Sequence, residues 1–149
     1  AYVRSGDWVG ISGVLDAIGR TIHKIGNAQK HTAEDYRAKK VMFVIITDGE
    51  ENSSREYSAE KVKAQIEQQK TKYGWEFIFL GANIDAVQTA GRFGIAPDRA
   101  VDYIADSEGT ELNFKVMSAV VATFREAGTV DEACFEEIRK DVKRRGGRE

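Results

Sequence analysis

The stretch that decides the fold is Val41-Met42-Phe43-Val44-Ile45-Ile46, followed by the polar run Thr47-Asp48-Gly49-Glu50-Glu51-Asn52. Six consecutive β-branched, aromatic and aliphatic residues are typical of a strand that is buried on both faces of a parallel sheet. The polar run predicts a loop with a glycine hinge at the end of that strand. A second run of the same kind occupies residues 75–80 and leads into a loop with Asn83 and Asp85.

Helical patterns surround these two strands. Residues 14–25 carry one apolar stripe, and Gly26-Asn27 predicts the end of that helix. Ser58 predicts the N-cap of a helix over residues 59–73, which buries Val62 and Ile66 and ends at Gly74. Further helices are predicted at residues 86–93, 112–125 and 131–145, and a short third strand at residues 100–104.

This alternation of strands and helices predicts a Rossmann-like, three-layer α/β/α fold with a mostly parallel sheet of about three strands. The crossovers between parallel strands are expected to be right-handed, with helices on both faces of the sheet. The chain has 149 residues and no internal repeat or low-complexity segment, so we expect a single domain over residues 1–149.

The composition narrows the classes of function. Hydrophobic residues make up 42% and charged residues 31%, with a net charge of −2, which favours a globular protein without a preference for nucleic acid or membranes. A single cysteine, Cys134, excludes an internal disulfide and a thiolate zinc cluster, and it favours the cytoplasm. Residues 139–149 contain six basic and two acidic residues, and we expect a solvated helix end there rather than a nucleic-acid arm.

Candidate chemistry lies where the predicted strands end. Ligands of open parallel sheets bind outside the carboxyl ends of the strands. One such end carries Asp48, Glu50, Glu51 and Asn52, and the next carries Asn83 and Asp85. Carboxylate oxygens are ligands for magnesium, calcium or manganese, and the alternative is a loop that is simply solvated.

Other chemistries have less support. His23 and His31 have no zinc-type spacing with Cys134, which we expect to be partly buried, and His23 is expected at the surface. The sequence contains no Gly-x-Ser-x-Gly elbow and no phosphate-binding glycine loop at the start of a helix. Enzymatic activity stays open only as a magnesium-dependent hydrolase that uses Asp48 and Glu50.

Three stretches together resemble the von Willebrand factor type A family. Residues 10–19, Gly-Ile-Ser-Gly-Val-Leu-Asp-Ala-Ile-Gly, are similar to the family segment Gly-x-Thr-x-Leu-x-Asp-Ala-Ile-Gly. Residues 41–52 resemble the fourth strand of the family and its loop, and residues 72–85 resemble a bacterial and phage branch. The resemblance covers residues 10–125 and implies the C-terminal half of the family fold, truncated at its N-terminal side. Residues 126–149 are expected to form a helical C-terminal extension.

The resemblance implies a protein-binding module with an incomplete metal-ion-dependent adhesion site. Asp48 matches the aspartate after the fourth strand, and Ser12 stands at the position of the family's threonine. The family's Asp-x-Ser-x-Ser loop does not occur in the sequence, so Ser12 and Asp48, even with Glu50, are expected to bind Mg²⁺ or Mn²⁺ only weakly. The remaining alternative to a binding module or a hydrolase is a structural remnant without a ligand.

The same resemblance predicts the partner. Without the family's first strand, the strand at residues 41–46 has one neighbour, and it has no charge or proline to prevent pairing with another chain. We therefore expect a homo-oligomer through this edge, for example a dimer about a twofold axis. In the alternative, residues 1–9, with Tyr2, Val3, Trp8 and Val9, cover the edge.

Overall fold

Five helices and three strands lie in the described part of the chain, residues 14–31, 41–47 and 57–146 of a computed structural model. Two short 3-10 turns, η2 and η3, accompany them. In chain order the elements are α1 (Val14–Lys30), β1 (Met42–Thr47), α2 (Ala59–Tyr73), β2 (Glu76–Gly81), α3 (Ala86–Arg92), η2 (Pro97–Arg99), β3 (Ala100–Asp102), α4 (Ser107–Ala127), η3 (Glu132–Phe135) and α5 (Glu136–Gly146).

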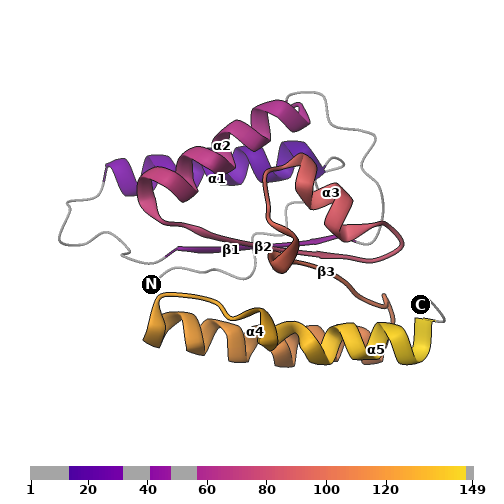
Figure 1. The fold of residues 1–149 in the computed structure, drawn as a ribbon. Helices are drawn as coiled ribbons and strands as arrows, with labels where there is room; N and C mark the ends of the chain where they lie inside the picture. The colour runs from indigo at the N-terminus through magenta and orange to yellow at the C-terminus, as the bar shows by residue number, and fades with distance from the viewer. Residues whose placement is uncertain (1–13, 32–40, 48–56, 147–149) are drawn as a thin grey trace.

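The three strands form a parallel sheet in the order β1-β2-β3. The register pairs Ile46 of β1 with Leu80 of β2, and Leu80 with Val101 of β3. Helices α1, α2 and α3 lie on one side of the sheet, and α4 and α5 lie on the other (Figure 1). The predicted three-layer α/β/α fold with a parallel, three-stranded sheet is therefore confirmed.

Helix α2 has the ends that its sequence predicts. Ser58 is the N-cap and accepts a hydrogen bond from the backbone N–H of Lys61 at 3.2 Å. Gly74 ends the helix with a φ of 68°, a left-handed conformation that glycine adopts without steric cost. Val62 and Ile66 are buried between these ends, as predicted.

Helix α1 is longer than predicted, because the Gly26-Asn27 stop is wrong. The helix continues to Lys30, and the backbone N–H of His31 donates to the carbonyl of Asn27. A glycine ends a helix efficiently only when it adopts positive φ, and Gly26 is not among the positive-φ residues. Inside a helix that packs against α2, Gly26 is tolerated at a cost of about 1 kcal/mol.

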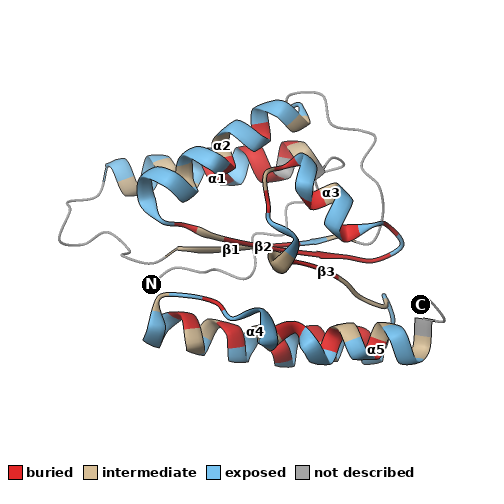
Figure 2. Ribbon diagram, in the orientation of Figure 1, coloured by how far each residue is buried: buried red, intermediate tan, exposed pale blue. Residues whose placement is uncertain are grey.

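Strand β2 carries the core of both layers. Phe77 and Phe79 pack under α1, α2 and α3, while Ile78 and Leu80 pack against α4 and α5. All four side chains are at most 2% exposed, and burial of each contributes about 1.5–3 kcal/mol. Figure 2 shows β2 as an almost continuous buried strand.

Strand β1 does not match the prediction of a strand buried on both faces. Only Ile45 is buried, Met42, Phe43 and Val44 are half-buried, and Ile46 is 45% exposed. Among the described strands β1 pairs with β2 alone, so it lies at a margin of the sheet and receives less cover than β2 (Figure 2). The uncharged sequence of β1 is therefore less buried than the same composition would be in a central strand.

None of the described helices has the length and apolar character to cross a membrane.

Candidate functional site

Because the three strands are parallel, their carboxyl ends lie at the same end of the sheet. The sequence places its candidate ligands there. Thr47 is the last residue of β1, and Asp48 and Glu50 follow it in the chain. Ser12, Asp48 and Glu50 all lie outside the described residues, as do Glu51 and Asn52. Within the described ranges, no group of three or more His, Cys, Asp or Glu side chains is arranged to hold a metal ion.

The described chain resumes at Tyr57, which contacts α1. The buried carboxylate of Asp16 in α1 accepts a hydrogen bond from the backbone N–H of Tyr57 at 2.8 Å. A Cβ on Gly19 would lie 2.3 Å from the Tyr57 ring, so the ring packs where Gly19 has no side chain. Asp16 and Gly19 belong to the Leu-Asp-Ala-Ile-Gly segment that carries the family resemblance, and here they contact Tyr57.

The acidic residue of the second predicted loop, Asp85, stabilises the start of a helix. Asp85 is the N-cap of α3, and its carboxylate accepts from the backbone N–H of Gln88 at 3.1 Å. Asp102, which ends β3, accepts from the backbone N–H of Ala86 at 3.0 Å. Asn83 is exposed and has a φ of 59°, a conformation that asparagine tolerates better than most residues. Sequence reasoning missed Asp102, because the predicted strand continues to residue 104, whereas β3 ends at Asp102.

The start of α4 meets the end of α5 in a cluster of charges, here called the Arg145 clamp: Asp106, Glu108, Asp141, Arg144 and Arg145. Arg145 binds both carboxylate oxygens of Asp141, at 2.7 and 2.6 Å, and reaches Asp106 Oδ2 at 2.6 Å. Asp106 also caps α4 by accepting from the backbone N–H of Gly109 at 2.7 Å.

Hydrogen bonds from Arg145 lower the pKa of both Asp106 and Asp141, so both carboxylates are ionised at neutral pH. The prediction that the basic C-terminal residues are simply a solvated helix end is wrong for Arg145. Its side chain is 22% exposed and joins α5 to α4. The charges of the clamp form ion pairs with one another.

The exposure of His23 and of Cys134 agrees with the prediction from the sequence. His23 is exposed and its Nε2 lies 3.2 Å from Nδ2 of Asn27, one turn along α1. Cys134 is half-buried beside the core between the sheet, α4 and α5.

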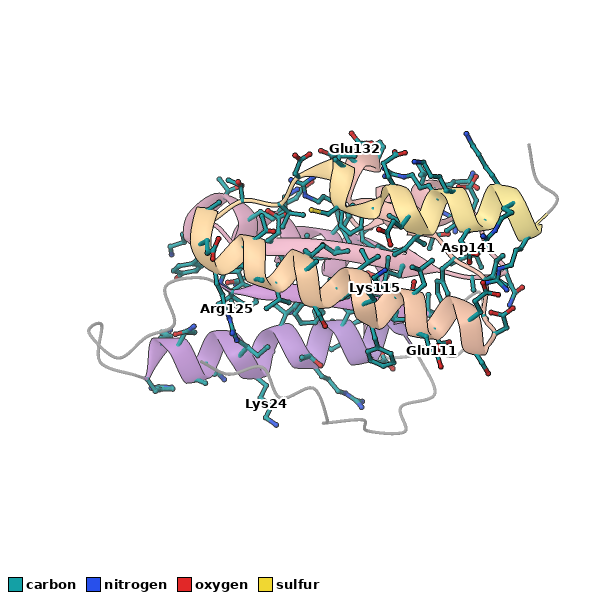
Figure 3. The ribbon with its side chains drawn as sticks, turned by 90° about the horizontal axis from the view of Figure 1, so that it is seen from below. Lys24, Glu111, Lys115, Arg125, Glu132 and Asp141 are labelled. Carbon is teal, nitrogen blue, oxygen red and sulfur yellow. The ribbon has the colours of Figure 1, made fainter. Side chains whose placement is uncertain are left out.

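An apolar stripe on α4 was not predicted. Phe114, Met117 and Val121 follow one another at helical spacing, and Phe114 is 67% exposed. Lys115 lies 3.7 Å from Glu137 of α5, so that side of α4 faces α5. The stripe lies on the opposite side of α4, and Figure 3 shows α5 along only one side of that helix.

The stripe therefore points toward the β1 side of the sheet. Met42 and Val44 face the same layer and pack with Met117 in one cluster, and Ile46 has the same parity. The strand β1 and the stripe Phe114, Met117 and Val121 are called the β1 surface below. None of these residues is charged, and Arg125, one turn after Val121 on α4, lies at the end of the stripe (Figure 3).

No protein-family model, no curated protein sequence and no solved structure matches this chain.

Proposed function

We propose that this chain is a protein-interaction module of the von Willebrand factor A type, which binds through the β1 surface. The observation that carries the proposal is an uncharged strand, β1, at an edge of the described sheet. Its Ile46 is 45% exposed, and Phe114 of the neighbouring helix α4 is 67% exposed. Exposed apolar side chains beside an edge strand are characteristic of sites where proteins meet. The family assignment rests on the three sequence stretches, and the parallel three-layer architecture is compatible with it.

The partner that we propose first is a second copy of this chain. Two β1 strands that run antiparallel about a twofold axis bring no like charges together, because residues 42–47 are all uncharged. Each copy then adds backbone hydrogen bonds to the other's sheet, and the α4 stripes bury Phe114. An edge that carried lysine or glutamate would resist such pairing.

The metal site is proposed to be degenerate. Ser12 and Asp48, with Glu50, supply fewer oxygen ligands than the about six that a hard divalent cation takes. In this proposal recognition rests on the β1 surface rather than on a tightly held Mg²⁺ or Mn²⁺. The single cysteine, Cys134, favours a location in the cytoplasm, where thiols stay reduced.

Light scattering at tens of micromolar protein tests the association. The parent chain is expected to have twice the monomer mass, and Val44→Lys and Ile46→Lys are each expected to give a monomer. Ile46→Lys is the milder change, because Ile46 is already exposed. The matched control is Thr71→Lys, which adds the same charge at an exposed position of α2 and is expected to leave the dimer intact.

A parent chain that is monomeric, with Val44→Lys changing neither mass nor solubility, would overturn the edge-pairing proposal. That result would favour the alternative in which residues 1–9 cover β1.

A further inference from the structure

The side of α4 that faces away from α5 carries a charged residue at each end of its apolar stripe. Glu111 lies one turn before Phe114, and Arg125 lies one turn after Val121. Figure 3 shows Glu111 and Arg125 near opposite ends of α4. Both side chains are exposed, so each is accessible to a partner that covers the stripe.

The order of residues along this side of α4 is self-complementary. Spacings of three and four residues place the following side chains on one stripe: Glu111, Phe114, Ser118, Val121 and Arg125. Ser118 lies halfway between Glu111 and Arg125 and, to within one residue, halfway between Phe114 and Val121. When a second α4 runs antiparallel with Ser118 beside Ser118, each Glu111 therefore meets an Arg125. In the same arrangement each Phe114 meets a Val121.

The middle of the stripe permits two helices to approach closely. Ser118 and Ala122, one turn later, are both small and exposed. The Ser118 hydroxyl donates to the carbonyl of Phe114 at 2.8 Å, so it keeps a hydrogen-bond partner within its own helix when it is covered. The axes of packed helices lie about 8–10 Å apart, depending on the side chains at the contact, and small side chains favour the shorter distances.

The twofold axis proposed for β1 arranges α4 in this way. In a continuous antiparallel sheet the axis is perpendicular to the sheet, so both α4 helices stay on one face and run in opposite directions. Met117, next to Ser118, packs in the same core cluster as Met42 and Val44 of β1. The middle of the α4 stripe therefore lies close to the middle of β1, and one axis serves both contacts.

The ion pairs within the chain do not use Glu111. Lys115, one turn after Glu111, lies 3.7 Å from Glu137 of α5 instead. Glu111 forms no ion pair with another residue in the described part of the chain. A cation of a second chain therefore pairs with Glu111 without displacing an existing partner.

We infer that α4 pairs with α4 of a second copy in antiparallel orientation, and that Glu111 and Arg125 make this contact specific for a second copy. The inference rests on the proposed self-association through the β1 surface and adds two reciprocal ion pairs to it. Burial of Phe114, which is 67% exposed in the single chain, contributes affinity. The charges contribute specificity, because a parallel arrangement places Glu111 beside Glu111 and Arg125 beside Arg125.

Charge reversal tests this pairing, with the Kd of the dimer measured by analytical ultracentrifugation. Glu111→Arg places two arginines together at both ends of the contact, and Arg125→Glu places two glutamates together there. Each variant is expected to weaken the parent dimer by about tenfold or more. The matched control is Glu67→Arg, which makes the same charge change at an exposed position of α2 and is expected to leave the Kd unchanged.

A mixture of the two variants distinguishes pairing from a general loss of stability. A dimer of one Glu111→Arg copy and one Arg125→Glu copy again has opposite charges at both ends of the contact. Native mass spectrometry of an equal mixture is expected to show mainly this heterodimer, with a Kd within about threefold of the parent value. The double variant Glu111→Arg/Arg125→Glu is expected to form a homodimer for the same reason.

Salt gives an independent measurement. At about 1 M NaCl the screening length falls to about 3 Å, so the difference in Kd between the parent and Glu111→Arg is expected to shrink to less than about threefold. A difference that keeps its full size in salt would overturn the pairing through charge.

The inference is overturned, while association through β1 stands, if the parent is a dimer and both single variants keep its Kd. It is also overturned if the single variants dissociate and neither the mixture nor the double variant restores a dimer. A monomeric parent chain overturns the proposed self-association, and this inference with it.

Discussion

At the β3 edge of the sheet, polar side chains bind neighbouring elements. At the β1 edge, the described chain leaves apolar side chains in contact with solvent. Arg99 binds Glu76 at 2.7 Å and the carbonyl of Val130 at 2.5 Å, and Asp102 holds the start of α3. The Arg145 clamp then joins α5 to α4. At β1, by contrast, Ile46 and Phe114 are exposed. Polar side chains join the elements at the β3 edge, whereas the described side chains at the β1 edge are uncharged and partly exposed.

The largest expected effect compares the β1 edge with the central strand β2, in two register partners, Ile46 and Leu80. Leu80→Ala creates a cavity in a fully buried site and is expected to lower the free energy of unfolding by about 2–5 kcal/mol. Ile46→Ala removes a half-exposed side chain and is expected to cost about 0.5–1 kcal/mol. Urea unfolding at low protein concentration, where association does not contribute, measures both. Equal costs would show that β1 is as buried as β2.

The Arg145 clamp gives a smaller effect that depends on pH. Asp141→Ala is expected to lower the free energy of unfolding by about 1–3 kcal/mol at neutral pH, because it leaves Arg145 without its main partner. The pKa of Asp141 and of Asp106 is lowered from 3.8 in the folded state, mainly by the hydrogen bonds from Arg145. The stabilisation is therefore fully present above the unfolded value of 3.8, and it is lost as the pH falls through the lower folded values.

Urea unfolding of the parent and of Asp141→Ala between about pH 2 and 7 checks this pH dependence. The two curves should converge in acid and run parallel above about pH 5. A matched control is Arg139→Gln, which breaks an exposed pair with Glu132 and is expected to cost at most about 1 kcal/mol. A difference that persists unchanged at the acid end would mean that the clamp carboxylates contribute nothing through their ionisation.

The smallest expected effect concerns metal at the end of β1. Calorimetric titration with Mg²⁺ or Mn²⁺ is expected to show no site tighter than the high-micromolar range, about −5 to −6 kcal/mol. Asp102 at the end of β3 holds a backbone amide, whereas Asp48 follows β1 without the family's Asp-x-Ser-x-Ser loop. A low-micromolar site that Asp48→Ala abolishes would contradict the degenerate site and restore metal-dependent adhesion.

Local signals predicted the elements well where a cap residue defines an end. Ser58 and Gly74 define α2, and the predicted bounds of that helix agree with the structure. The apolar pattern predicts a helix from Leu112, but α4 begins at Ser107, where the carboxylate of Asp106 caps it. The predicted strand bounds lie within two residues of the observed ones, and the two longer runs, 41–46 and 75–80, are rich in β-branched and aromatic residues.

Features that depend on contacts distant in sequence were not predictable from local patterns. The partners Asp106 and Arg145 are 39 residues apart, so the basic end of α5 was interpreted as solvated. The exposure of Phe114 depends on which side of α4 is occupied by α5, and spacing within α4 does not contain that information. The candidate metal ligands Ser12, Asp48 and Glu50 lie outside the described residues, so that site stays a prediction.

The strand order has a consequence for synthesis. Because the order in the sheet equals the order in the chain, each described strand pairs with the one made just before it. During translation β1 emerges before β2, and it carries its uncharged sequence without any of the described strand neighbours until β2 follows. Ribosomes that follow one another on the same message then hold several nascent β1 strands close together. For a chain that pairs through this strand, dimers would form on the polysome, before α4 and α5 are complete.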